Sequence, residues 1–291
     1  MLILDLSYMM NPEMIRLANI VIILIILFLI LREFKKRAWY RAIRYYTPTV
    51  FKNWYLSRYP RSQPFKIVGQ YNINPNDDKI LSTSLYGHHP IYFDGSIQRA
   101  KEVKRLMPGW KLRIYCHDKV DQNHIKKLID HDVQVVIVND PEIKPKESAG
   151  AFWRFMPLAE DITFISIDLD NTIPQYLLAM TRHWENQPEP FMRESRVSQT
   201  PWPKFHTLGG FFGKKKGSWT IPAEWITHYK LRNPFGSDEY FLANKIIPLA
   251  LEYGMVTYYS DQIVKFMRTW ISPGRKLIGN RDIVFPNHWT K

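Results

Sequence analysis

The chain has 291 residues, which is enough for one large domain and an appendage. Hydrophobic residues make up 45% of it, which is the composition of a globular protein, and aromatic residues are abundant. The formal net charge of +13 is concentrated, because residues 32–61 hold nine Lys or Arg and a single acid. The remainder is only mildly basic, so the charge gives no reason to expect nucleic acid as a partner. The lone Cys116 excludes an intramolecular disulfide and favours a reducing compartment.

An uncharged apolar segment covers residues 17–31, after an N-terminal tail of residues 1–16. It is short for a membrane span, which needs about 20 residues, but the flanking Arg16 can extend its side chain to the interface. Basic residues crowd the C-terminal flank, and Lys and Arg are enriched on the cytoplasmic side of membrane spans. We therefore predict a transmembrane helix in a single-pass membrane protein whose C-terminal bulk is cytosolic. A buried core helix is the alternative.

Residues 32–64 alternate basic side chains with Trp, Tyr and Phe. Cationic and aromatic side chains together favour the headgroup region of an anionic membrane, so this segment is predicted to be a stem that contacts membrane lipids. A helix packed on the following domain is the alternative. Pro60 and Pro64 end the stem, and the main domain is expected to cover residues 65–291.

Apolar runs alternate with helical patterns through the first half of this domain. Strands are expected at residues 79–86, 111–116, 133–138 and 164–167, and helices at residues 91–106, 122–131, 148–160 and 176–184. Alternating strands and helices predict an α/β fold, with a mostly parallel sheet flanked by helices in three layers.

The last of these strands leads directly into Asp168-Leu169-Asp170. Open α/β sheets bind ligands at the carboxyl ends of their strands, and two carboxylates one residue apart suit Mg²⁺ or Mn²⁺. Three interpretations compete. The pair can be the Asp-x-Asp of a GT-A glycosyltransferase or the Asp-x-Asp-x-Thr of a haloacid-dehalogenase-like phosphatase, with Asp168 as nucleophile and Asp170 as acid/base. It can also be two solvated carboxylates that cap a helix.

The rest of the chain favours the first interpretation. In the phosphatases the motif opens the domain and an acidic pair follows it, whereas here three strand–helix units precede it and the only Asp-Asp pair, residues 77–78, is upstream. The order of segments also resembles a group of bacterial, algal and viral proteins that are related to nucleotide-diphospho-sugar transferases. The matching stretches are ILSTSLYGHHPIY, PGWKLRIYCHD, AGAFWRFMPLAE, DLDNTI, LGGFFGKKKG and GSDEYFLANKIIPL. The resemblance implies a GT-A-like, Rossmann-type sheet.

The resemblance also implies a donor site. Tyr86 and Gly87, which end the first strand, would contact the nucleotide base and ribose. Arg154 would face the donor, where a guanidinium can hold a phosphate or a sugar hydroxyl, although a surface arginine is the plain alternative. Gly209 and Gly210 would line the sugar pocket, because glycine allows the backbone to approach a ligand closely; an ordinary turn is the alternative.

Metal and acceptor sites follow in the same way. Asp168, Asp170 and Asp261 are the expected ligands of Mn²⁺ or Mg²⁺, with Asp168 also implied on the donor. Asp238 or Glu239 is the expected base that takes the proton of the attacking hydroxyl in an inverting reaction. The alternative is that Asp238 simply begins a helix as its N-cap.

The sequence therefore predicts a membrane-anchored, metal-dependent glycosyltransferase. Its donor would be a nucleotide-diphosphate sugar, and its acceptor would be a glycan or glycoconjugate. The phosphatase remains one alternative. A non-catalytic, membrane-bound glycan-binding protein on a degenerate transferase fold is the other.

Overall fold

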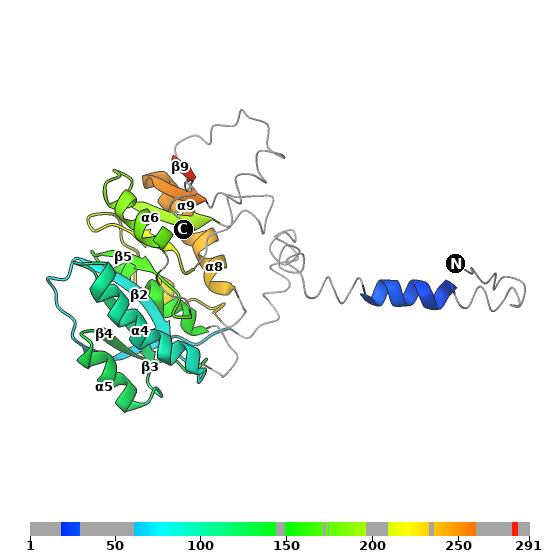
Figure 1. Ribbon diagram of the computed structural model, residues 1–291, viewed down its shortest axis with the longest axis horizontal. Helices are drawn as coiled ribbons and strands as arrows, with labels where there is room; N and C mark the ends of the chain where they lie inside the picture. The colour runs from blue at the N-terminus through cyan, green and yellow to red at the C-terminus, as the bar shows by residue number, and fades with distance from the viewer. Residues whose placement is uncertain are drawn as a thin grey trace, which may run out of the picture. The chain divides into compact units, whose positions relative to one another are not determined.

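The structure is a computed structural model, and it describes residues 19–29, 61–143, 149–170, 173, 175–195, 209–232, 236–259 and 281–284. The chain divides into two compact units, Met1–Trp54 and Tyr55–Lys291. In the first unit, residues 19–29 form a helix whose side chains are all exposed (Figure 1). No helix within the described ranges has both the length and the apolar character needed to cross a membrane. The predicted span of residues 17–31 extends beyond this helix at both ends, so the anchor stays a prediction.

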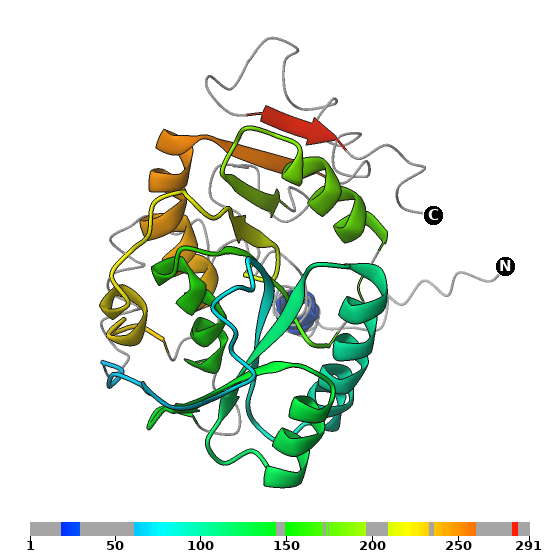
Figure 2. The same ribbon diagram turned by 90° about the vertical axis from the view of Figure 1, so that its left-hand side faces the viewer.

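The described residues of the second unit form a nine-stranded mixed sheet with the strand order β1-β4-β3-β2-β5-β7-β6-β8-β9 (Figures 1 and 2). The strands are β1 (Lys66–Tyr71), β2 (Lys79–Leu85), β3 (Lys111–His117), β4 (Gln134–Asn139), β5 (Thr163–Ser166), β6 (Phe191–Ser195), β7 (Phe212–Lys214), β8 (Met255–Tyr259) and β9 (Arg281–Val284). The helices of this unit are α4 (Pro90–Leu106), α5 (Gln122–Asp130), the 3-10 helix η2 (Ala149–Ala159), α6 (Gln175–Glu185), α7 (Glu224–Thr227), α8 (Ser237–Phe241), the π-helical turn η5 (Leu242–Ile246) and α9 (Ile247–Tyr253).

Helices cover both faces of the sheet, which gives the three predicted layers. Side chains alternate along each strand, so that Leu81 of β2 belongs to the core cluster on the face with α4, α5 and α6, while its neighbour Ile80 belongs to the cluster with η2 and α7 to α9. Figure 2 shows α4 and α5 next to each other on one face and β9 at an edge of the sheet.

Strand order reverses beside β2. From β2 the chain runs through α4, β3 and α5 to β4 on one side, and η2 then returns it to β5 on the other side of β2. Both neighbours, β3 and β5, are parallel to β2. In open α/β sheets the crevice outside such a reversal is where ligands bind. The carboxyl ends of β2 and β5 are therefore the place to look for a site.

Most of the predicted elements are present within one or two residues of their expected ends. The segment expected as a helix over residues 148–160 is a 3-10 helix, and it contains Pro157, which cannot donate a backbone hydrogen bond. The strands β1, β6, β7 and β9 were not expected. Because β1 and β7 pair antiparallel with their neighbours, the sheet is mixed rather than wholly parallel.

Candidate functional site

The acidic pair lies directly beyond the carboxyl end of β5. This strand ends at Ser166, and its hydroxyl donates to the carbonyl of Gly209 at 2.6 Å, which fixes the neighbouring loop. Asp168 and Asp170 are exposed, and the side chain of Leu169 between them is buried. Both carboxylates are therefore at the solvent-exposed surface, on a segment that Leu169 anchors in the core.

Arg154 joins Asp168 to the acceptor side of the predicted site. It comes from η2, and although only 7% exposed, it donates through Nη1 to Asp168 Oδ1 and through Nη2 to Asp238 Oδ2, the latter at 2.7 Å. Burial alone would lower the pKa of this guanidinium, but the two carboxylates outweigh burial and raise it. Arg154 is thus a permanently charged bridge between two carboxylates that are 70 residues apart in the sequence.

The two glycines are packed against this bridge. A Cβ added to Gly209 would lie 2.2 Å from Arg154 Nη2 and 2.5 Å from Asp238 Oδ2, and one added to Gly210 would lie 2.3 Å from Asp168 Oδ2. No side chain fits at either position without displacing the charged groups. From the sequence we predicted that a ligand approaches the backbone of these glycines. In the structure the glycines lie against the three charged side chains. Their contact with a sugar stays a prediction.

Tyr86 lies beside the same cluster, immediately after β2. Its ring packs against Gly150, where an added Cβ would come within 2.4 Å of the ring, and meets the edge of Trp153 at a centroid distance of 5.7 Å. The next residue, Gly87, has φ +78, a left-handed conformation that glycine adopts without strain. The chain therefore turns sharply where β2 ends.

Electrostatic coupling places the Tyr86 hydroxyl in the field of this cluster. Burial raises the pKa of Tyr86; the positive charge of Arg154 opposes that shift, and the carboxylates of Asp238 and Asp168 add to it. The phenol thus remains neutral at physiological pH and is available as a hydrogen-bond donor.

Helix α4 supplies charged groups on the other side of the acidic pair, and the sequence analysis did not identify them. Arg99 is only 2% exposed, and it forms a 2.5 Å ion pair with Glu102. The carboxylates of Asp170 and Asp168 act electrostatically on both Arg99 and Tyr92. The missed signal was the position of Arg99 and Glu102 beside core residues of α4, where charged side chains are rarely buried unless they are paired.

Helix α8 carries the predicted base candidates. Its N-cap is Gly236, with φ +74, and no side chain caps the helix. Asp238 is therefore not the N-cap that the sequence suggested as an alternative; its buried carboxylate binds Arg154 instead. The adjacent Glu239 is partly exposed.

The donor set around the acidic pair fits a hard divalent ion. Within the described residues no group of three or more His, Cys, Asp or Glu is arranged to hold a metal, and Asp261 lies outside these residues. Mg²⁺, however, is commonly held by one or two carboxylates, with water and phosphate completing its shell. The charged side chains around the acidic pair, which are joined by ion pairs or by electrostatic coupling, are Arg99, Arg154, Glu102, Asp168, Asp170 and Asp238.

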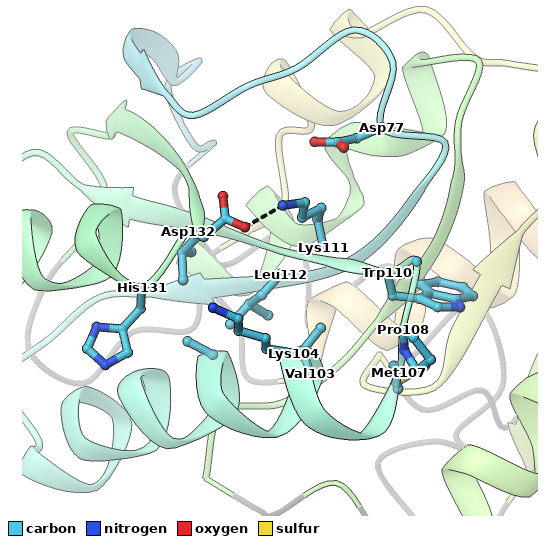
Figure 3. A pocket seen from close by; sticks show the side chains of 13 residues that line it. Asp77, Val103, Lys104, Met107, Pro108, Trp110, Lys111, Leu112, His131 and Asp132 are labelled. Carbon is cyan, nitrogen blue, oxygen red and sulfur yellow. Dashed lines mark hydrogen bonds and ion pairs between the residues drawn. The ribbon is translucent and has the colours of Figure 1, made fainter.

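A cavity of about 330 Å³ lies at the opposite, amino end of the strands. Figure 3 shows it between the end of α4, Trp110 and His131, with Lys111 paired to Asp132 at its side. Its charged groups are of both signs, and it has no contact with the acidic pair. This cavity therefore contributes nothing to the site at the end of β5.

No protein-family model matches this chain, and no curated protein matches it either. The family resemblance therefore stays an expectation from the six ordered stretches of sequence. The function must be argued from the chemistry of the site itself.

Proposed function

We propose that this chain is a membrane-anchored, metal-dependent glycosyltransferase with a GT-A-like fold. It would move a sugar from a nucleotide-diphosphate donor to a glycan or glycoconjugate acceptor. One observation carries the proposal: Arg154 bonds both Asp168 and Asp238 beside the strand reversal, so the residues expected on the donor and on the acceptor share one charged cluster.

On the donor side, Asp170 and Asp168 would hold Mn²⁺ or Mg²⁺ with their carboxylate oxygens. When bound, such an ion offsets the negative charge that develops on the leaving diphosphate. Arg154 would bind a phosphate or sugar oxygen while remaining bonded to Asp238, since a guanidinium carries five N–H donors. The neutral phenol of Tyr86 would donate to the nucleotide beside it.

On the acceptor side, Asp238 and Glu239 divide two tasks. Asp238 is buried and paired with Arg154, so its carboxylate orients the guanidinium that faces the donor. Glu239 follows it on α8 and is partly exposed, which suits a group that takes a proton from an acceptor hydroxyl. The two acids therefore differ in what their removal should change.

Membrane attachment is proposed on the apolar helix of residues 19–29. Its large apolar side chains are between 45% and 64% exposed, an unusual amount of apolar surface for one helix. The basic residues that follow would face a negatively charged cytoplasmic leaflet. Lipid is the environment that would cover such a helix.

The test is a thermal-shift screen of the full chain against UDP-, GDP-, ADP- and dTDP-sugars, with and without Mn²⁺. One nucleotide sugar is expected to raise the melting temperature only when Mn²⁺ is present. Asp170→Asn should abolish this shift without changing the melting temperature of the unliganded protein. Asp130→Asn, which changes an exposed carboxylate on α5, is the control and should respond like the wild type.

Three outcomes would overturn the proposal. A nucleotide-sugar response that survives both EDTA and Asp170→Asn would remove the metal from the mechanism. No response to any nucleotide, together with a stable complex with beryllium fluoride at Asp168, would favour the phosphatase instead; no response to either would favour the glycan-binding protein.

A further inference from the structure

One face of α4 lies against the segment that contains the acidic pair. Gly95, Arg99 and Glu102 are spaced four and three residues apart, so they share a face of the helix. A Cβ on Gly95 would lie 2.2 Å from the carbonyl oxygen of Leu169, so the helix backbone lies directly against the residue between the two aspartates. Seven residues further along the helix, Glu102 Oε2 accepts a hydrogen bond of 2.9 Å from the backbone N–H of Ile173.

The Arg99–Glu102 pair places a balanced charge beside this segment. Both residues are buried, and Glu102 also accepts a hydrogen bond from Gln98 at 3.0 Å. Burial lowers the pKa of Arg99, and the charges of Glu102 and Asp170 oppose that shift. Arg99 Nε has no hydrogen-bond partner among the described residues, so most of the support for this buried cation comes from Glu102.

We propose that Glu102 is a positioning residue for the acidic pair: it ties the segment after Asp170 to α4 and neutralises Arg99 beside the carboxylates. Only the charge role rests on the proposed function, because it is tested by the metal-binding measurement described below. A divalent ion at Asp168 and Asp170 would meet the field of Arg99, and without Glu102 the unbalanced guanidinium would oppose its binding. Because Glu102 acts through other groups, its two actions can be tested apart.

The first test follows the backbone by hydrogen–deuterium exchange of the full chain. Glu102→Ala should speed exchange in peptides that span residues 167–177, because Ile173 N–H loses its acceptor. Glu102→Gln should keep the protection, because the amide oxygen can still accept this bond. Glu160→Ala is the matched control: it removes a carboxylate paired with the buried Arg113, away from the acidic pair. Unchanged exchange in Glu102→Ala would overturn the tether.

The second test measures Mn²⁺ affinity by the loss of the free-ion electron paramagnetic resonance signal. Glu102→Ala should weaken binding by on the order of 10- to 100-fold, as outer-shell partners of metal sites do. Glu102→Gln should weaken binding less, and adding Arg99→Met to it should restore affinity, because the unbalanced cation is removed. A double variant that binds no better than Glu102→Gln would overturn the charge role. If the wild type binds no Mn²⁺, the metal-dependent function and the charge role are both wrong. The hydrogen–deuterium exchange experiment still tests whether Glu102 ties Ile173 to α4.

Discussion

At the scale of single residues, the site depends most on one buried arginine. Arg154 and Asp238 are both at least nine-tenths buried, whereas the Asp168 side chain is 48% exposed. The Arg154–Asp238 contact is therefore little screened by water, and either partner alone would be a buried, unpaired charge. Gly209 packs directly against this contact, since any larger side chain would collide with both groups.

This burial predicts a specific thermodynamic pattern. Arg154→Met should lower the free energy of unfolding by roughly 3–5 kcal/mol, because the charge of Asp238 stays buried without its partner. Adding Asp238→Asn should recover part of that loss, because a neutral amide costs less to bury. Chemical denaturation of both single variants and the double variant gives the interaction energy. Strictly additive losses would show that the two side chains are not coupled.

At this scale, sequence reasoning selected residues that lie in ordered motifs, and their roles stay predictions. Arg154, Asp168, Asp238, Gly209 and Gly210 were all singled out, and the structure brings them together. It missed the α4 side, because an Arg and a Glu three residues apart look like an ordinary pair on a solvated helix. The structure buries this pair against the segment after β5.

At the scale of elements, the 3-10 helix η2 is the part that positions the site. Trp153 donates to Asp140 Oδ2 at 3.0 Å, and Arg232 is bonded to the same buried carboxylate. Ser82 of β2 donates to the carbonyl of Arg154 at 2.7 Å. These bonds attach η2 to the middle of β2 and to the residue that follows β4, so Arg154 is held at the strand reversal.

Strand and helix positions were predictable wherever the hydrophobic period was long enough to read. The segments β2, β3 and β4 and the helices α4 and α5 have clear patterns and appear near their expected ends. The strand β7 has only three residues, which is too few to show a period, and β1 ends before a polar turn. Their antiparallel pairing depends on distant partners, which local sequence does not specify.

The α8 helix carries a prediction that separates its two adjacent acids. Asp238→Asn should weaken donor binding, because it removes one carboxylate that orients Arg154. Glu239→Gln should leave donor binding intact and lower turnover by on the order of 10² or more if Glu239 is the base. Donor-dependent thermal shifts and kcat with the identified donor test both. Lys245→Gln, on the exposed side of the next turn, is the control.

The opposite pattern would reassign the base. A large fall in kcat for Asp238→Asn at unchanged donor affinity would make Asp238 the proton acceptor. Full activity in both variants would remove this helix from the mechanism.

At the scale of the whole molecule, one short strand joins two parts of the sheet. The strand β7 pairs with β5 on one side and β6 on the other, and Lys214 lies opposite Phe164 and Phe191. The Lys214 side chain is fully buried, and its Nζ donates to the carbonyl of Glu160 at 2.5 Å. The central strand that joins the two parts of the sheet therefore carries a buried lysine, whose Nζ is bonded to a backbone carbonyl.

This lysine makes the stability of the molecule depend on pH in a defined direction. Burial lowers the pKa of Lys214 to about 8, below the ordinary value of 10.5 that it regains on unfolding. Below pH 8 both states carry the proton, and the folded state bears the full cost of the buried charge. Between about pH 8 and 10.5 the unfolded state binds more protons, so the free energy of unfolding rises with pH.

We therefore expect the free energy of unfolding of the wild type, measured relative to that of Lys214→Met, to increase as the pH is raised from 8 to 10. The gain should approach about 1.4 kcal/mol per pH unit at most, and taking the difference between the two proteins cancels the titration of the buried tyrosines. Lys216→Met is the control, because the hydrogen bond that Lys216 Nζ donates to Asp78 raises the pKa of Lys216, which therefore gives no gain in this range. Urea denaturation at closely spaced pH values measures the three curves. A constant difference between wild type and Lys214→Met would show that Lys214 keeps an ordinary pKa in the folded protein, and that the join between the two parts of the sheet is more hydrated than its burial indicates.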